Sequence, residues 1–92
     1  MSRRAEWQVV LDSEIKRWSS MSCKYLVAEL HEVQAYVVEV HSSQYQVEVQ
    51  LLENTNGYVH VLVAVDDGSL PWSIVPLTRS FICQKSAASA GT

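Results

Sequence analysis

The chain has 92 residues, of which 48% are hydrophobic and 18% are charged, and its formal net charge at pH 7 is −3. This length predicts one domain, and the composition is that of an ordinary folded protein rather than a disordered or disulfide-rich one. A mildly acidic chain without clustered positive charge is not expected to bind nucleic acid or an anionic membrane.

The N-terminal third predicts two helices. Apolar residues recur at helical spacing from Trp7 to Trp18 within residues 4–18, and both tryptophans fall on the face expected to be buried. A serine-rich segment ends this helix. Ser22 is suited to cap a second helix over 23–32, because its hydroxyl accepts hydrogen bonds from amides of the first turn. The buried stripe of the second helix is expected to contain Leu26, Val27, Leu30 and Val33.

The hydrophobic period then changes from 3.6 to 2, which predicts strands over 35–41 and 44–53. Ser42 and Ser43 are expected to form a two-residue hairpin loop that pairs His41 with Gln44. In this register one face of the hairpin is apolar and the other polar. The apolar face is expected to contain Tyr36, Val38, Val40, Tyr45, Val47, Val49 and Leu51.

A third strand is predicted over 58–66, and the length of the preceding loop decides which way its valines face. A three-residue loop over 55–57 pairs Asn54 with Tyr58 and turns the valines to the core, whereas a loop one residue longer turns them to water. We favour the three-residue loop, because Gly57 suits the left-handed position that the accompanying bulge requires. The valines directed inward are then Val59, Val61, Val63 and Val65.

A fourth strand is predicted over 74–84. Pro76 cannot donate to a sheet, so this strand lies at an edge or begins after the proline. Its core residues are expected to be Leu77, Phe81 and Cys83. We expect a single domain over 1–85, followed by a flexible tail over 86–92.

The order of elements predicts an α+β fold, in which two N-terminal helices pack on one face of a four-stranded antiparallel meander. In outline this is similar to the cystatin-type arrangement of a helix across a curved meander. That similarity is one of fold only, and it implies no function.

Cysteine usage and the absence of a targeting segment predict an intracellular protein. Cys23 and Cys83 lie 60 positions apart and belong to no metal or redox motif, so two free thiols are expected. No apolar run is long enough to span a bilayer, and no apolar segment of a secretory signal follows the basic start of the chain. The predicted compartment is the cytoplasm.

Charge is unevenly distributed along the chain. Residues 1–24 carry five cations and three anions, whereas residues 25–92 carry two cations and seven anions. The two parts either attract each other, within a subunit or between subunits, or are ordinary solvated faces.

The best candidate site is the outer face of the predicted sheet, which changes from polar to apolar around Leu62. A half-apolar sheet face often marks a partner surface. The candidate interface residues are Tyr58, His60, Leu62, Ala64, Glu48, Gln50 and Trp72. Trp72 either anchors an interface or covers one end of the core.

The sequence predicts no catalytic residue, metal site or cofactor. His60 is expected opposite Leu52, about 26 Å from the residue that faces His41, which is too far for a shared metal ion. Asp66 and Asp67 fall short of the oxygen ligands that calcium requires and are expected to form a turn.

Three functions are compatible with the sequence. The first is a non-catalytic module that forms a homodimer through its outer sheet face or an edge strand. The second is an acidic inhibitor or immunity-type protein that binds a heterologous protein. The third is a small-molecule binder or enzyme with a pocket between helices and sheet.

Overall fold

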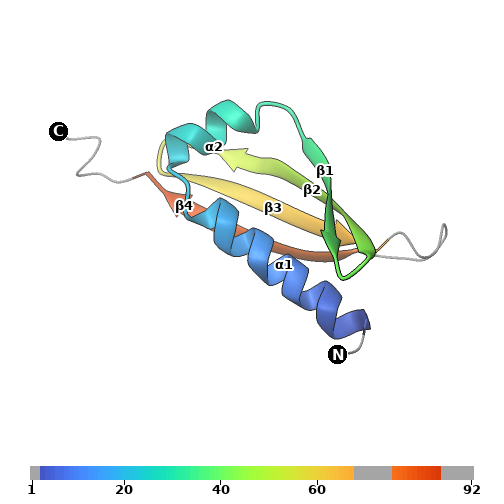
Figure 1. The fold of residues 1–92 in the computed structure, drawn as a ribbon. Helices are drawn as coiled ribbons and strands as arrows, with labels where there is room; N and C mark the ends of the chain where they lie inside the picture. The colour runs from blue at the N-terminus through green and yellow to red at the C-terminus, as the bar shows by residue number, and fades with distance from the viewer. Residues whose placement is uncertain (1–2, 68–75, 86–92) are drawn as a thin grey trace.

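The computed structural model describes residues 3–67 and 76–85, and Figure 1 shows their arrangement. The α+β class is confirmed, with two helices and one antiparallel sheet in the order β1-β2-β3-β4. The elements are α1 (Arg3–Ser19), α2 (Cys23–Glu29), β1 (Gln34–Val40), β2 (Ser43–Asn54), β3 (Tyr58–Asp66) and β4 (Leu77–Gln84). The predicted tail over 86–92 lies outside the described residues. Neither helix is long and apolar enough to cross a membrane.

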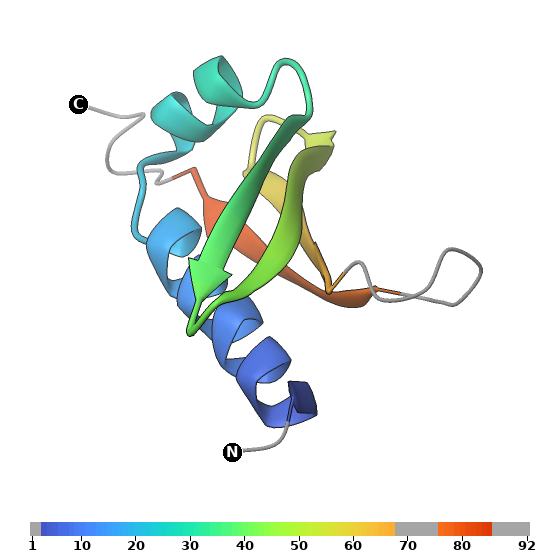
Figure 2. The same ribbon diagram turned by 45° about the vertical axis from the view of Figure 1, so that its right-hand side comes forward.

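Helix α1 lies against β3 and β4, as both views show (Figures 1 and 2). Its helical apolar spacing is confirmed as a core face, since Trp7 and Trp18 are both buried. The indole nitrogen of Trp7 also donates a hydrogen bond of 2.7 Å to the carbonyl of Val65. The large apolar rings of α1 therefore fill the core while their polar atoms remain hydrogen-bonded.

Helix α2 begins where the sequence predicts and ends earlier. Ser22 is its N-cap, with the hydroxyl oxygen accepting from the amide of Tyr25 at 3.1 Å. The helix ends at Glu29 rather than at residue 32, so Val33 is exposed and its predicted burial is wrong. A helix that stops one turn early takes Val33 off the buried stripe, while Leu26 remains fully buried.

The first hairpin keeps the predicted faces but uses a different loop. Val40 pairs with Ser43, so the two-residue loop is His41–Ser42 rather than Ser42–Ser43, and Glu39 faces Gln44. Both loop residues have positive φ, 48° and 74°, as a type I′ turn requires. Moving the loop by one residue slides each pairing by two positions, which leaves every side chain on its predicted face.

The second hairpin turns the valine row inward as predicted, but its bulge lies at a different position. Val61 faces Leu51, and all four valines of β3 are fully buried. The bulge, however, lies in β2 at Leu52, and Gly57 lies outside the left-handed region. The predicted role of Gly57 is therefore wrong.

The turn itself explains why Gly57 needs no left-handed backbone. The hydroxyl oxygen of Thr55 accepts from the amides of Gly57 and Tyr58 at 3.1 and 3.0 Å, and the Thr55 amide donates to the Tyr58 carbonyl. This tight turn pairs Asn54 with Val59 instead of Tyr58. The extra residue at Leu52 then restores the register that buries the valines.

Strand β4 is an edge strand and begins immediately after Pro76, as predicted. The predicted core residues of this strand are half-buried and pack against the core cluster; they are Leu77, Phe81 and Cys83. Arg79 lies on the same side and pairs with Asp12 of α1 at 2.7 Å. The strand is thus tied to α1 by both apolar and charged contacts.

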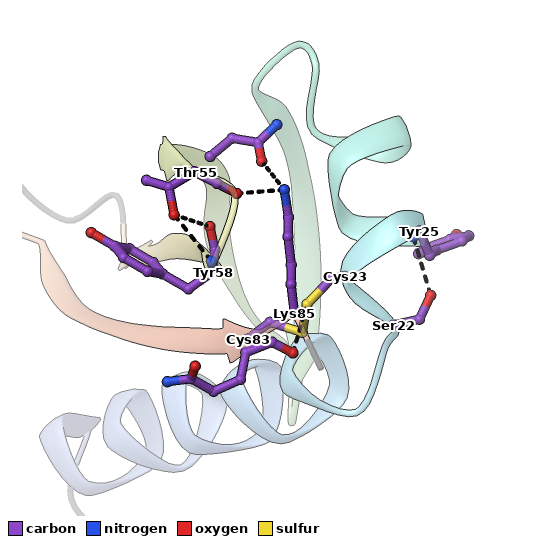
Figure 3. The surroundings of a disulfide bond; sticks show 9 residues. Ser22, Cys23, Tyr25, Thr55, Tyr58, Cys83 and Lys85 are labelled. Carbon is purple, nitrogen blue, oxygen red and sulfur yellow. Dashed lines mark hydrogen bonds between the residues drawn. A yellow bond between two sulfur atoms is a disulfide. The ribbon is translucent and has the colours of Figure 1, made fainter. Parts of the chain in front are cut away.

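The prediction of two free thiols is wrong, because Cys23 and Cys83 form a disulfide (Figure 3). Their Cα atoms are 5.8 Å apart, within the range for such bonds. The bond joins the first residue of α2 to the end of β4. Beside it, the Lys85 amine donates hydrogen bonds to the Asn54 side-chain oxygen at 2.7 Å and the Thr55 carbonyl at 2.6 Å. One end of the sheet is therefore held by a covalent bond and a lysine contact.

Candidate interaction surface

The outer sheet face is the side of the strands opposite the core cluster, and it contains every predicted interface residue that the structure describes. Tyr58, His60, Leu62 and Ala64 alternate with the buried valines of β3. On β2, Gln50 pairs with Leu62 and Glu48 pairs with Ala64. The seventh candidate, Trp72, lies outside the described residues.

Two apolar residues of this face were missed by the sequence analysis. Ile82 of β4 pairs with His60 and is 51% exposed, and Leu52 at the bulge is 47% exposed. Ile82 lies diagonally across from the half-buried Leu62, and Leu52 lies along β2 between the partners of Leu62 and His60; we call these three residues the aliphatic strip. Strict alternation could have identified both, because Ile82 alternates with the core residues of β4 and Leu52 was already expected opposite His60 on this face.

A small polar cluster borders the aliphatic strip. His60 faces Glu53, not Leu52 as predicted, because the bulge shifts the register by one residue. The imidazole Nδ1 lies 3.6 Å from the Glu53 carboxylate, and the Tyr58 hydroxyl donates to the same carboxylate at 3.0 Å. This hydrogen bond raises the pKa of Tyr58, because a nearby negative charge disfavours the phenolate.

The charges of the outer face all have one sign in the described part of the chain. No lysine or arginine lies on it, since Arg79 and Lys85 contact α1 and the β2–β3 turn. The acidic residues on this face are Glu39, Glu48, Glu53 and Asp66. The surface therefore combines an aliphatic strip with acidic residues on β1, on β2 and at the end of β3.

A second polar cluster, which the sequence analysis did not identify, lies between α1 and β1. The Glu14 side chain is buried, and its carboxyl group accepts a hydrogen bond from the Tyr36 hydroxyl. That hydroxyl also accepts from the Trp18 indole at 2.8 Å, and the Arg17 guanidinium lies 5.7 and 5.6 Å from the centres of the Trp18 and Tyr36 rings. These groups satisfy one another, so the cluster is a structural joint rather than an open site.

A histidine–carboxylate contact and an open hollow are the described features that bear on metal and small-molecule binding. His41 contacts Glu6 of α1 at 3.1 Å, and nowhere in residues 3–67 and 76–85 do three metal-ligating side chains gather. An open hollow of about 220 Å³ lies along β1 and β2, lined by Tyr36, Val47 and their neighbours. The residues that line it belong to β1 and β2, and its volume is smaller than the roughly 300 Å³ of typical ligand pockets.

Comparison with known proteins finds no match for this chain among protein-family models, curated proteins or solved structures.

Proposed function

We propose that the chain is a non-catalytic interaction module that forms a homodimer by pairing β1 with β1 of a second copy. The observation that carries this proposal is the open edge of β1, which among the described strands pairs with β2 alone. Natural edge strands are usually protected by lysine, proline, a bulge or short length. Strand β1 has seven regularly paired residues and none of these protections.

The side chains of β1 leave apolar area accessible on both faces of the sheet. On the outer face Val37 is 56% exposed. On the core side Tyr36 and Val38 are only half-buried, whereas Val47 and Val49 of the neighbouring strand are fully buried. A further strand beside β1 would bury this area, and burial of apolar surface favours association.

A second copy of β1 fits the open edge in an antiparallel register centred on Val37. A two-residue loop is closed by a hydrogen-bonded pair, so Ala35, Val37 and Glu39 direct their N–H and C=O groups away from β2. Pairing Val37 with its counterpart places Glu39 opposite Ala35 and Tyr36 opposite Val38. This two-fold register brings no like charges face to face.

The edge is favoured over the outer sheet face, the other surface that the sequence suggests for self-association. Stacking two outer faces about a two-fold axis would bring together two sets of four acidic side chains with no cation between them. Like-charge juxtaposition of this kind disfavours association. Strand β1 contributes one acidic residue, Glu39.

Size-exclusion chromatography with light scattering tests the dimer at micromolar concentration. We expect twice the monomer mass for the natural chain and the monomer mass for Val37→Lys, because lysine on an open edge disfavours strand pairing. Val9→Lys is the matched control, since Val9 is 51% exposed on α1 and is expected to leave the dimer intact. A monomeric natural chain contradicts the proposal, and so does a dimer broken by Leu62→Asp but not by Val37→Lys.

The disulfide bears on the compartment in which this module works. Such bonds form and persist in oxidising environments, so Cys23–Cys83 favours an oxidising compartment over the predicted cytoplasm. Trapping free thiols in intact cells with a maleimide reagent, followed by mass spectrometry, distinguishes the two. Unmodified cysteines support the oxidising compartment, and two modified cysteines support the cytoplasm.

A further inference from the structure

We propose that the outer sheet face binds a heterologous protein through a positively charged surface, one that presents lysine or arginine beside an apolar centre. This surface is distinct from the β1 edge, and the proposal does not depend on the homodimer.

The first support is the separation of charge between the two sides of the molecule. The outer face carries four acidic residues and, within the described chain, no lysine or arginine. Most of the described cations lie on the helices; they are Arg4, Lys16, Arg17 and Lys24. A face of one sign attracts partners of the opposite sign and repels nucleic acid and anionic lipid.

The second support is that two of these carboxylates are available for a partner. Glu39 and Glu48 are exposed, and neither forms a hydrogen bond or ion pair with any residue in the described part of the chain. Glu6, Glu14 and Glu53, by contrast, are each engaged by a tyrosine hydroxyl. An exposed carboxylate that has no internal role can pair with an incoming cation without breaking an existing contact.

The third support is the aliphatic strip formed by Leu52, Leu62 and Ile82. Glu48 lies one cross-strand row from Leu62 on the same face, because Gln50 and Leu62 are paired and Glu48 precedes Gln50 by two residues. Apolar side chains beside solvated charges are the usual layout of a protein interface, in which the centre supplies burial and the rim supplies steering. The acidic residues therefore determine which partner fits the apolar centre.

A second copy of this chain is the main alternative partner for the outer sheet face, because its helices carry cations. Helix-on-sheet contact between copies would be head-to-tail, however, and such contacts build open assemblies unless the rotation closes. This alternative predicts a mass that grows with concentration, which light scattering detects.

The test is titration of the isotope-labelled chain with a short amphipathic peptide of lysine and leucine, followed by amide NMR. A glutamate–leucine peptide of equal length is the control for apolar attraction alone. We expect the lysine peptide to shift outer-face amides of β2, β3 and β4, with affinity falling as salt is added. The glutamate peptide is expected to leave these amides unchanged.

Three variants sharpen this test. Glu48→Gln is expected to weaken binding of the lysine peptide up to about fivefold, as for one exposed charge pair. Leu62→Ser is expected to weaken it about tenfold or more through lost burial. Glu32→Gln, which removes an exposed carboxylate outside the sheet, is expected to leave the affinity unchanged.

Several results would overturn the proposal. They are failure of the lysine peptide to bind, equal binding of the two peptides, shifts confined to the helices or to the β1 edge, or equal effects of Glu48→Gln and Glu32→Gln. If the mass of the natural chain rises with concentration and Leu62→Ser blocks this rise, the face would be assigned to a second copy instead.

Discussion

At the scale of single residues, Tyr36 joins α1 to the edge of the sheet through one hydroxyl group. The hydroxyl accepts a hydrogen bond from Trp18 and donates one to Glu14, whose side chain is only 8% exposed. Burial and the bond to Glu14 raise the pKa of Tyr36 to about 12. Both causes favour the neutral phenol, so the fold depends on its proton.

The Tyr36 proton gives a prediction for alkaline pH. Between pH 10 and 12 the unfolded chain loses a phenolic proton that the folded chain keeps, so the free energy of unfolding should fall as the pH rises through this window. Below pH 10 the contribution is complete. Urea denaturation at intervals from pH 8 to 12 measures the fall, which should be smaller in Tyr36→Phe.

The same variant tests the buried carboxyl group at neutral pH. Removing the hydroxyl leaves Glu14 without its tyrosine donor and should lower the free energy of unfolding by about 1–3 kcal/mol. Tyr25→Phe is the control, because Tyr25 is exposed and should change stability little. Equal effects of the two variants would contradict the role assigned to Tyr36.

At the scale of elements, the β1–β2 hairpin shows how a turn sets register. A type I′ loop requires two residues with positive φ, and His41 and Ser42 occupy these positions although neither is glycine. His41 also contacts Glu6 of α1. The observed loop thus includes a residue, His41, that contacts the helix, and the sequence pattern alone does not reveal this contact.

Glycine scanning of this loop tests the observed register. Ser42→Gly should raise the free energy of unfolding by about 0.5–1 kcal/mol, since relief of left-handed strain exceeds the added freedom of the unfolded chain. Ser43→Gly should lower it by a similar amount, because Ser43 begins β2 and glycine weakens a strand. Thermal denaturation of both variants measures the difference, and stabilisation by both would indicate the Ser42–Ser43 loop instead.

At the scale of the whole molecule, the disulfide connects elements from opposite ends of the chain. Cys23 and Cys83 close a loop across 60 positions, which includes β1, β2 and β3. Closing so long a loop restricts the unfolded chain strongly. Stability should therefore depend on redox conditions more than on any single surface contact.

Removal of the disulfide measures this dependence. The double variant Cys23→Ser/Cys83→Ser should lose about 4 kcal/mol of unfolding free energy on the loop-entropy estimate. Reducing the natural chain with dithiothreitol should lower its Tm to about that of the double variant. A natural chain whose Tm does not respond to reductant would contradict a structural role for the bond.

The order of the elements and the faces of the strands could be predicted from the sequence, because side-chain alternation is a local property. Valines at every second position from 59 to 65 make one side of β3 the more apolar one, which indicates its buried side. The same alternation placed Tyr58, His60, Leu62 and Ala64 together on the outer face. Most of the candidate surface follows from this pattern, whereas the pairing of His60 with Glu53 does not.

Only the tertiary structure decided how distant residues meet. The tight turn at Thr55–Tyr58 and the buried valine row require pairings that differ by one residue, and the bulge at Leu52 reconciles them. The Cys23–Cys83 bond and the contact between Glu14 and Tyr36 likewise depend on how α2 and α1 lie relative to the strands. Such contacts are set by distances in space, which a periodic pattern along the chain does not contain.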